Sequence, residues 1–157
     1  MIEIGENASP MTISALAGPA LAAGVLAGLL DIGMAALINQ VSPVVVLKAI
    51  AAGLLGKAAF AGAAPVAVLG LTLQILMSVV IAGIYVAAAW HLPQLIAHPW
   101  LWGAAYGVAI FVVMNGFVVP LSAYPKLPEV TSYWVGSNLA AMLVFGLIVS
   151  TVARAWR

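Results

Sequence analysis

The chain has 157 residues, of which 66% are hydrophobic and 6% are charged. A soluble domain carries about 25% charged residues, so this composition cannot cover a surface that faces water. The net charge of +1 gives no field that would attract nucleic acid, and the absence of cysteine excludes disulfides and thiol chemistry. We therefore expect a single membrane domain over residues 1–157, with the lipid bilayer as a partner and no nucleic acid.

The N-terminal segment is acidic. Residues 1–14 contain Glu3 and Glu6 but neither lysine nor arginine. A secretory signal requires a positively charged start, so we expect the first apolar segment to be a retained helix.

Four apolar segments follow, over residues 15–38, 65–90, 100–119 and 134–155. Each is long enough for hydrocarbon ~30 Å thick, which needs about 20 residues. Lipid offers the backbone no hydrogen bonds, so the segments must be helices. The tryptophans lie at or beside the ends of these segments, as in an aromatic belt: Trp90, Trp100, Trp102, Trp134 and Trp156. The sequence thus predicts an all-α, four-transmembrane-helix bundle.

The first connection contains a further apolar run, residues 43–55, which is too short to span and carries Lys48. The pair Ser42-Pro43 is typical of a helix start, so we expect a short interfacial or re-entrant helix. Gly53, Gly56 and Gly62 are expected to end it and turn the chain into the second span.

The other two connections contain prolines. The short segment 91–99 holds two and predicts a tight turn between antiparallel helices. The segment 120–133 holds Pro120, Pro125 and Pro128, which favour an extended, stiff connection.

Asp31 lies inside the first span, where a carboxylate costs about 2.5–3.5 kcal/mol on insertion scales and usually faces protein or water. Gly24 and Gly28 share its helix face, which favours close packing against another helix. One interpretation is a proton-binding or ion-binding carboxylate; the alternative is a carboxyl that bonds a neighbouring helix. Gly103 and Gly107 predict a second close-packing face, on the third span.

The other spans also carry one strongly polar side chain each, in the same half of the bilayer as Asp31. These residues are Gln74, Asn115 and Asn138. At 1.5 Å per residue, all four lie roughly 6–14 Å below that surface. They could form a shared polar vestibule, or each amide could bond a neighbouring helix, which contributes about 0.6 kcal/mol per bond.

His91 and His98 both lie in the short second connection. Two histidines are weak candidates for ligating a metal or haem iron, but the neighbouring prolines and the interfacial position favour ordinary solvated residues. We predict no metal site. The sequence contains no phosphate-binding loop, dinucleotide fingerprint, zinc-protease helix or nucleophile elbow, so we predict no enzyme.

Seven short stretches follow one another along the chain: GLLDI at 28–32, SP at 42–43, LKAIAAGLLG at 47–56, LGLTLQ at 69–74, YG at 106–107, VMN at 113–115 and VPLS at 119–122. This order resembles the uncharacterised YagU-like bacterial inner-membrane proteins. The resemblance implies a four-helix membrane bundle in the bacterial inner membrane. Asp31 and Asn115 are the polar residues that match the resembling proteins best, whereas those proteins often carry histidine at the position of Gln74.

Three functions follow from these features. The first is an accessory or interaction subunit of a larger membrane complex or a homo-oligomer, because the chain has almost no mass outside the membrane and two small-residue faces. The alternative is a proton or small-solute channel or transporter that uses Asp31. A weaker alternative is a haem, pigment or lipid site between helices. We predict no cofactor and expect bound lipid, with haem or pigment left open.

Overall fold

The computed structural model describes residues 12–125 and 129–157, and every regular element in those ranges is a helix. Four helical stretches are long and apolar enough to cross a membrane. They are α1 (Ile13–Asn39), α4 (Ala64–His91), α8 (Ser132–Ala155), and the third span built from α6 (Pro99–Val113), the π-helical η1 (Met114–Val118) and α7 (Val119–Leu121). The predicted four-span, all-α fold is confirmed, and each predicted span limit lies within two residues of the observed one.

A shorter helix, α2 (Pro43–Leu55), occupies the predicted range 43–55. Ser42 is at the N-cap position, where its side chain makes no capping hydrogen bond, and Pro43 is the first helical residue. Gly56 ends the helix at φ 63°, a value that glycine adopts without strain. The expectation for Gly53 was wrong, because it lies inside α2.

Two single-turn helices complete the connections. α3 (Ala58–Ala61) ends at Gly62, as expected for a turn into the second span. The predicted tight turn at 91–99 holds α5 (Gln94–Ala97), which begins directly after Pro93.

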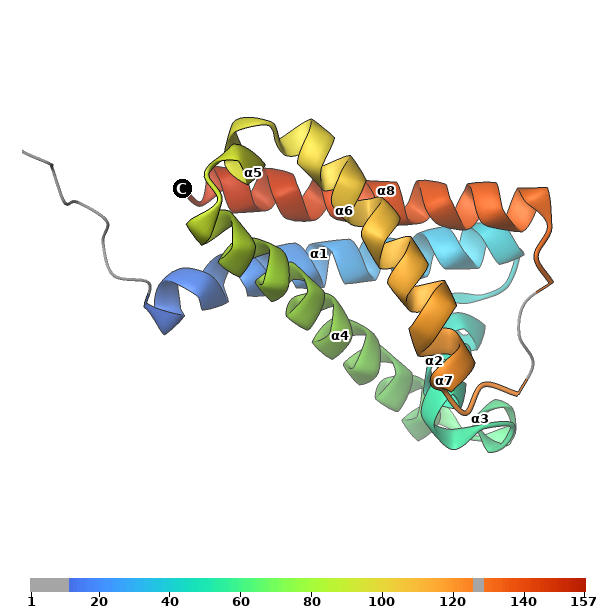
Figure 1. Ribbon diagram of the computed structural model, residues 1–157. Coiled ribbons are helices and arrows are strands. Elements are labelled where there is room, and N and C mark those ends of the chain that lie inside the picture. Colours follow the sequence, from blue (N-terminus) through green and yellow to red (C-terminus); the bar gives the residue numbers. More distant parts are fainter. Residues whose placement is uncertain (1–11, 126–128) are drawn as a thin grey trace, which may run out of the picture.

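The long helices form two crossed pairs (Figure 1). α1 and α8 run side by side in opposite directions, α4 crosses α1, and α6 crosses α8. A hydrogen bond joins α6 to α4, where the Tyr106 hydroxyl donates to the Ile81 carbonyl at 2.6 Å. The first and third connections lie at one end of the bundle. The second connection, the start of α1 and the C-terminus lie at the other.

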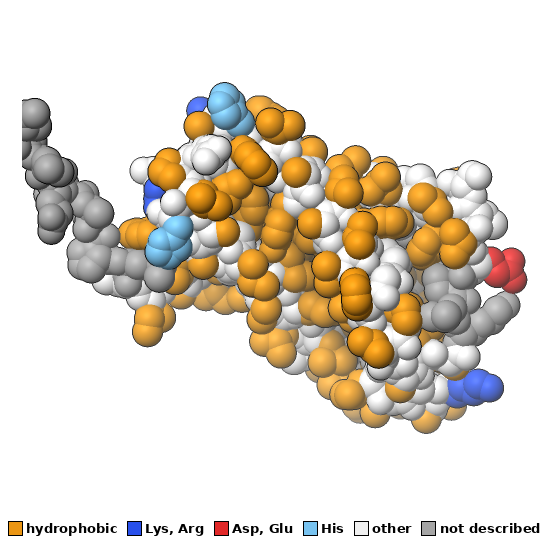
Figure 2. All heavy atoms as spheres, in the orientation of Figure 1, with side chains coloured by type: hydrophobic (Ala, Val, Ile, Leu, Met, Phe, Trp, Pro, Cys, Tyr) orange, Lys and Arg blue, Asp and Glu red, His pale blue; other side chains and the backbone are white. Residues whose placement is uncertain are grey.

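Most of the long helices' surface faces outward. At most 33% of the most apolar stretch of any span is buried, and the exposed side chains there are mostly leucine, valine and isoleucine. The visible face is apolar along its middle, and the charged side chains gather at its two ends (Figure 2). Lipid or other apolar protein must therefore cover these helices, which makes the chain a multi-pass membrane protein.

The third span ends later than predicted. Pro120 was expected to open an extended connection, but it lies in α7, and the chain leaves the helix at Ser122. Pro120 lacks the N–H that an α-helix uses, and the preceding turn is already widened, with the Val119 N–H bonded to the Met114 carbonyl five residues back. The part of the predicted stiff connection at 126–128 lies outside the described residues.

Candidate functional site

Small residues bring α1 against α4 near the only carboxylate in the four described spans. A Cβ atom at Gly24 would lie 2.5 Å from Val79 Cα, and one at Gly28 would lie 2.6 Å from Ser78 Oγ. Real Cβ atoms do not approach other atoms so closely, so this helix spacing requires glycine at position 24, where the neighbour is backbone, and at position 28 a larger residue would displace the Ser78 side chain. The predicted packing role of Gly24 and Gly28 thus corresponds to a direct contact with α4.

Asp31 and Gln74 meet across this interface. Gln74 Nε2 donates to Asp31 Oδ2 at 2.9 Å, and the Gln74 side chain is only 7% exposed. Within the described residues Asp31 Oδ1 has no hydrogen-bond partner, and no fully buried polar atom there is left unpaired. Oδ1 is therefore not fully buried, and the carboxylate is hydrogen-bonded through one of its two oxygens.

The two asparagines do not join this pair. Asn115 Nδ2 donates to the Phe111 carbonyl at 3.0 Å, and Asn138 Nδ2 donates to the Trp134 carbonyl at 2.9 Å. Each amide thus bonds its own helix four residues back and leaves the neighbouring helices unbonded. Two of the four predicted polar residues are brought together, and the described contacts do not link all four into a vestibule.

Asn115 instead lines a groove of about 390 Å³ between the third span and the start of α8. Phe111 and Trp134 form part of its wall, with ring centroids 6.3 Å apart. Both Asn115 and Trp134 are half-buried. The groove is therefore an apolar hollow with one amide in it.

Gly103 and Gly107 lie against α8. A Cβ at Gly107 would lie 2.7 Å from Leu143 Cα, and one at Gly103 would lie 3.0 Å from the Gly146 carbonyl oxygen. Gly146 and Ser150 are the matching small residues on α8, and sequence reasoning missed them. Their spacing of four residues is the same small-residue signal that identified Gly103 and Gly107.

A second missed contact joins α4 to α2. Gly70 lies directly against the Leu47 carbonyl, and Gly70, Gln74 and Ser78 are all buried on one face of α4. A repeat of small or polar residues at every fourth position was the available signal.

His91 ends α4 and His98 directly precedes α6, and both are exposed. Within residues 12–125 and 129–157, no three side chains of His, Cys, Asp or Glu lie close enough to hold a metal ion. Among the described residues, His91 and His98 thus have no third His, Cys, Asp or Glu beside them.

No family model, no curated protein and no solved structure matches this chain. The resemblance to the YagU-like proteins therefore stays a prediction that depends on the motifs quoted above.

Proposed function

We propose that this protein is an interaction subunit of the bacterial inner membrane, which packs through its third span against a second copy or another membrane protein. The observation that carries the proposal is the Asn115 groove on the most exposed of the four spans. The YagU-like motifs are the reason for choosing the bacterial inner membrane.

The third span is the least covered. Only 11% of its most apolar stretch is buried, against 28–33% in the other three. Its extended helix packing is with α8, and Tyr106 adds a contact with α4. Lipid alone covers an apolar surface well, so exposure by itself does not require a protein partner.

The side-chain amide of Asn115 favours a protein partner over lipid at this groove. Asn115 donates to its own helix, but its amide oxygen accepts no hydrogen bond from any described residue. Hydrocarbon cannot supply a donor, and an amide left unpaired there costs about 2–7 kcal/mol, depending on the reference state. A helix from a second subunit can supply both apolar contact for Phe111 and Trp134 and a donor for Asn115.

Cysteine cross-linking tests this proposal, because the chain contains no cysteine of its own. Gly116 lines the groove, and a Cβ atom there would meet nothing within 4 Å, so Gly116→Cys should fold normally. The matched control is Val68→Cys, at a similar distance from the same end of the bundle, where the side chain is 62% exposed on α4. In native membranes, a benzophenone group attached to the cysteine of Gly116→Cys should cross-link to a partner on irradiation, whereas the same label on Val68→Cys should leave the protein monomeric.

Mass spectrometry of the cross-linked band identifies the partner as a second copy or a different membrane protein. A lone monomer in mild detergent, with equal or no cross-linking at both positions, would rule the proposal out.

A second candidate is a proton or small-solute pathway, favoured by the Asp31 carboxylate inside a span, whose Oδ1 has no hydrogen-bond partner among the described residues. Asp31→Asn removes the charge but keeps an oxygen that accepts from Gln74. If the pathway exists, the flux of protons or small solutes into reconstituted vesicles should be lost with Asp31→Asn. It should persist with Asn138→Ala, since the Asn138 side chain bonds only its own helix. Unchanged flux in Asp31→Asn would eliminate this candidate.

A further inference from the structure

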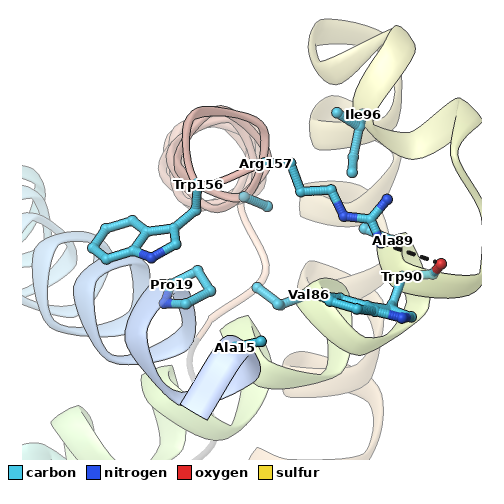
Figure 3. Close-up of a pocket in the computed structure, with 9 residues that line it drawn as sticks. Ala15, Pro19, Val86, Ala89, Trp90, Ile96, Trp156 and Arg157 are labelled. Atoms are coloured by element: carbon cyan, nitrogen blue, oxygen red, sulfur yellow. Dashed lines mark hydrogen bonds between the residues drawn. The ribbon is translucent and has the colours of Figure 1, made fainter. Parts of the chain in front are cut away.

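A pocket lies at the end of the bundle that holds the C-terminus, away from the Asn115 groove. It measures about 270 Å³ and lies between the start of α1, the end of α4, α5 and the end of α8. Pro19, Val86 and Ile96 give it apolar walls. Trp156 and Arg157 leave the end of α8 in different directions, Trp156 toward α1 and Arg157 toward α4 (Figure 3).

The Arg157 guanidinium is fixed by Trp90. Its carbon lies 4.6 Å from the centroid of the Trp90 ring, and Nη2 donates to the Trp90 carbonyl at 3.3 Å. Both contacts are to neutral groups, so the positive charge is positioned but not neutralised. A guanidinium has five N–H donors, and the described part of the chain offers Arg157 only this one acceptor.

The surroundings of the pocket are those of the lipid headgroup region. Trp90 and Trp156 lie at helix ends, where tryptophan marks the membrane–water interface. The charged residues described at this end are Arg154 and Arg157, while Glu3 and Glu6 lie outside the described residues. A ligand that fits must combine an anionic group for Arg157 with an apolar part for the pocket wall.

We propose that this pocket binds one anionic phospholipid, with its phosphate on Arg157 and an acyl chain along Pro19 and Val86. The planar guanidinium suits phosphate oxygens, because two parallel N–H donors can bond them at once. The contact with Trp90 orients that fork before the lipid arrives, which lowers the entropy lost on binding.

The test is native mass spectrometry of the full chain in detergent, titrated with dioleoyl phosphatidylglycerol or with dioleoyl phosphatidylcholine. The intact protein should retain one phosphatidylglycerol in preference to phosphatidylcholine. Arg157→Gln should weaken phosphatidylglycerol binding roughly fivefold, the effect expected for one basic residue at the headgroup. Thermal unfolding of the same sample checks that the variant is folded.

Arg154→Gln is the matched control, because it removes the same charge from an exposed residue that does not line the pocket. It should weaken binding by less than about twofold, since its charge is screened by water and salt. Equal losses in the two variants would show general surface attraction and overturn the proposal. So would disappearance of the Arg157→Gln effect in a Glu3→Gln/Glu6→Gln background, because Arg157 would then act through the N-terminal segment.

Discussion

The helix pairs α1–α4 and α6–α8 are both closely packed, but they differ in what holds them together. In α6–α8, glycines lie on both helices, and a Cβ atom at Gly146 would come within 2.7 Å of the Gly107 nitrogen. Backbone therefore contacts backbone, and no side-chain hydrogen bond joins the described residues of these two helices. In α1–α4, the glycines at the closest approach lie on α1, opposite Ser78 and Val79, whereas Gly83 of α4 has ordinary spacing to Ala20. The Asp31–Gln74 hydrogen bond adds a polar link.

This difference separates two ways to fix a helix pair in lipid. Close backbone approach gains van der Waals contact over the whole interface, and it is lost when any side chain intrudes. A polar bond adds little energy but specifies which residues face each other, because a slipped helix would leave the carboxylate unpaired. We therefore expect α6–α8 to be sensitive to side-chain size and α1–α4 to be sensitive also to polarity.

The largest effect should come from Gly107→Leu. The new side chain would meet the Met142 carbonyl and Leu143 Cα, and backbone atoms cannot move aside without separating α6 from α8. We expect the free energy of unfolding in detergent micelles, measured by titration with a denaturing surfactant, to fall by about 3 kcal/mol. Gly136→Leu is the control, since a Cβ at that position on α8 meets nothing within 4 Å. Equal losses in the two variants would contradict the close-contact argument.

Gln74→Leu should have the next largest effect. It removes the donor to Asp31 Oδ2 inside a tightly packed interface, so the free energy of unfolding should fall by about 1–2 kcal/mol. Asp31→Asn keeps an acceptor for Gln74 and should cost less than about 0.6 kcal/mol. The same surfactant titration checks both. If Asp31→Asn destabilised the protein more than Gln74→Leu, the carboxylate would have another role in stability than the bond to Gln74.

The sequence predicts the spans well because hydrocarbon thickness and the backbone's need for internal hydrogen bonds leave few alternatives. The close-packing role of Gly24 and Gly107 was also predictable, because small residues spaced four apart lie on one helix face whatever the rest of the chain does. The third span's late end was missed because a π-helical turn before Pro120 lets the proline stay helical.

The pairing of polar residues was harder to predict. Membrane depth places Asp31, Gln74, Asn115 and Asn138 in one half of the bilayer, but depth does not determine which side chains face each other. That depends on how far each helix is rotated about its axis and where it crosses its neighbour. Asn115 and Asn138 bond their own helices instead, an option open to any amide side chain in a helix.

The smallest effect should come from Ser150→Ala, which tests whether polarity matters at all between α6 and α8. Ser150 is fully buried beside Gly103, but its hydroxyl donates to the Leu147 carbonyl of its own helix. Losing that bond should change the free energy of unfolding by less than about 0.5 kcal/mol, since the two helices share no hydrogen bond through this side chain. Ser150→Leu should instead destabilise the pair by about 1–3 kcal/mol, because the larger side chain collides with Gly103. A large loss in Ser150→Ala, measured by the same titration, would mean that α6–α8 depends on a polar contact after all and would remove the distinction from α1–α4.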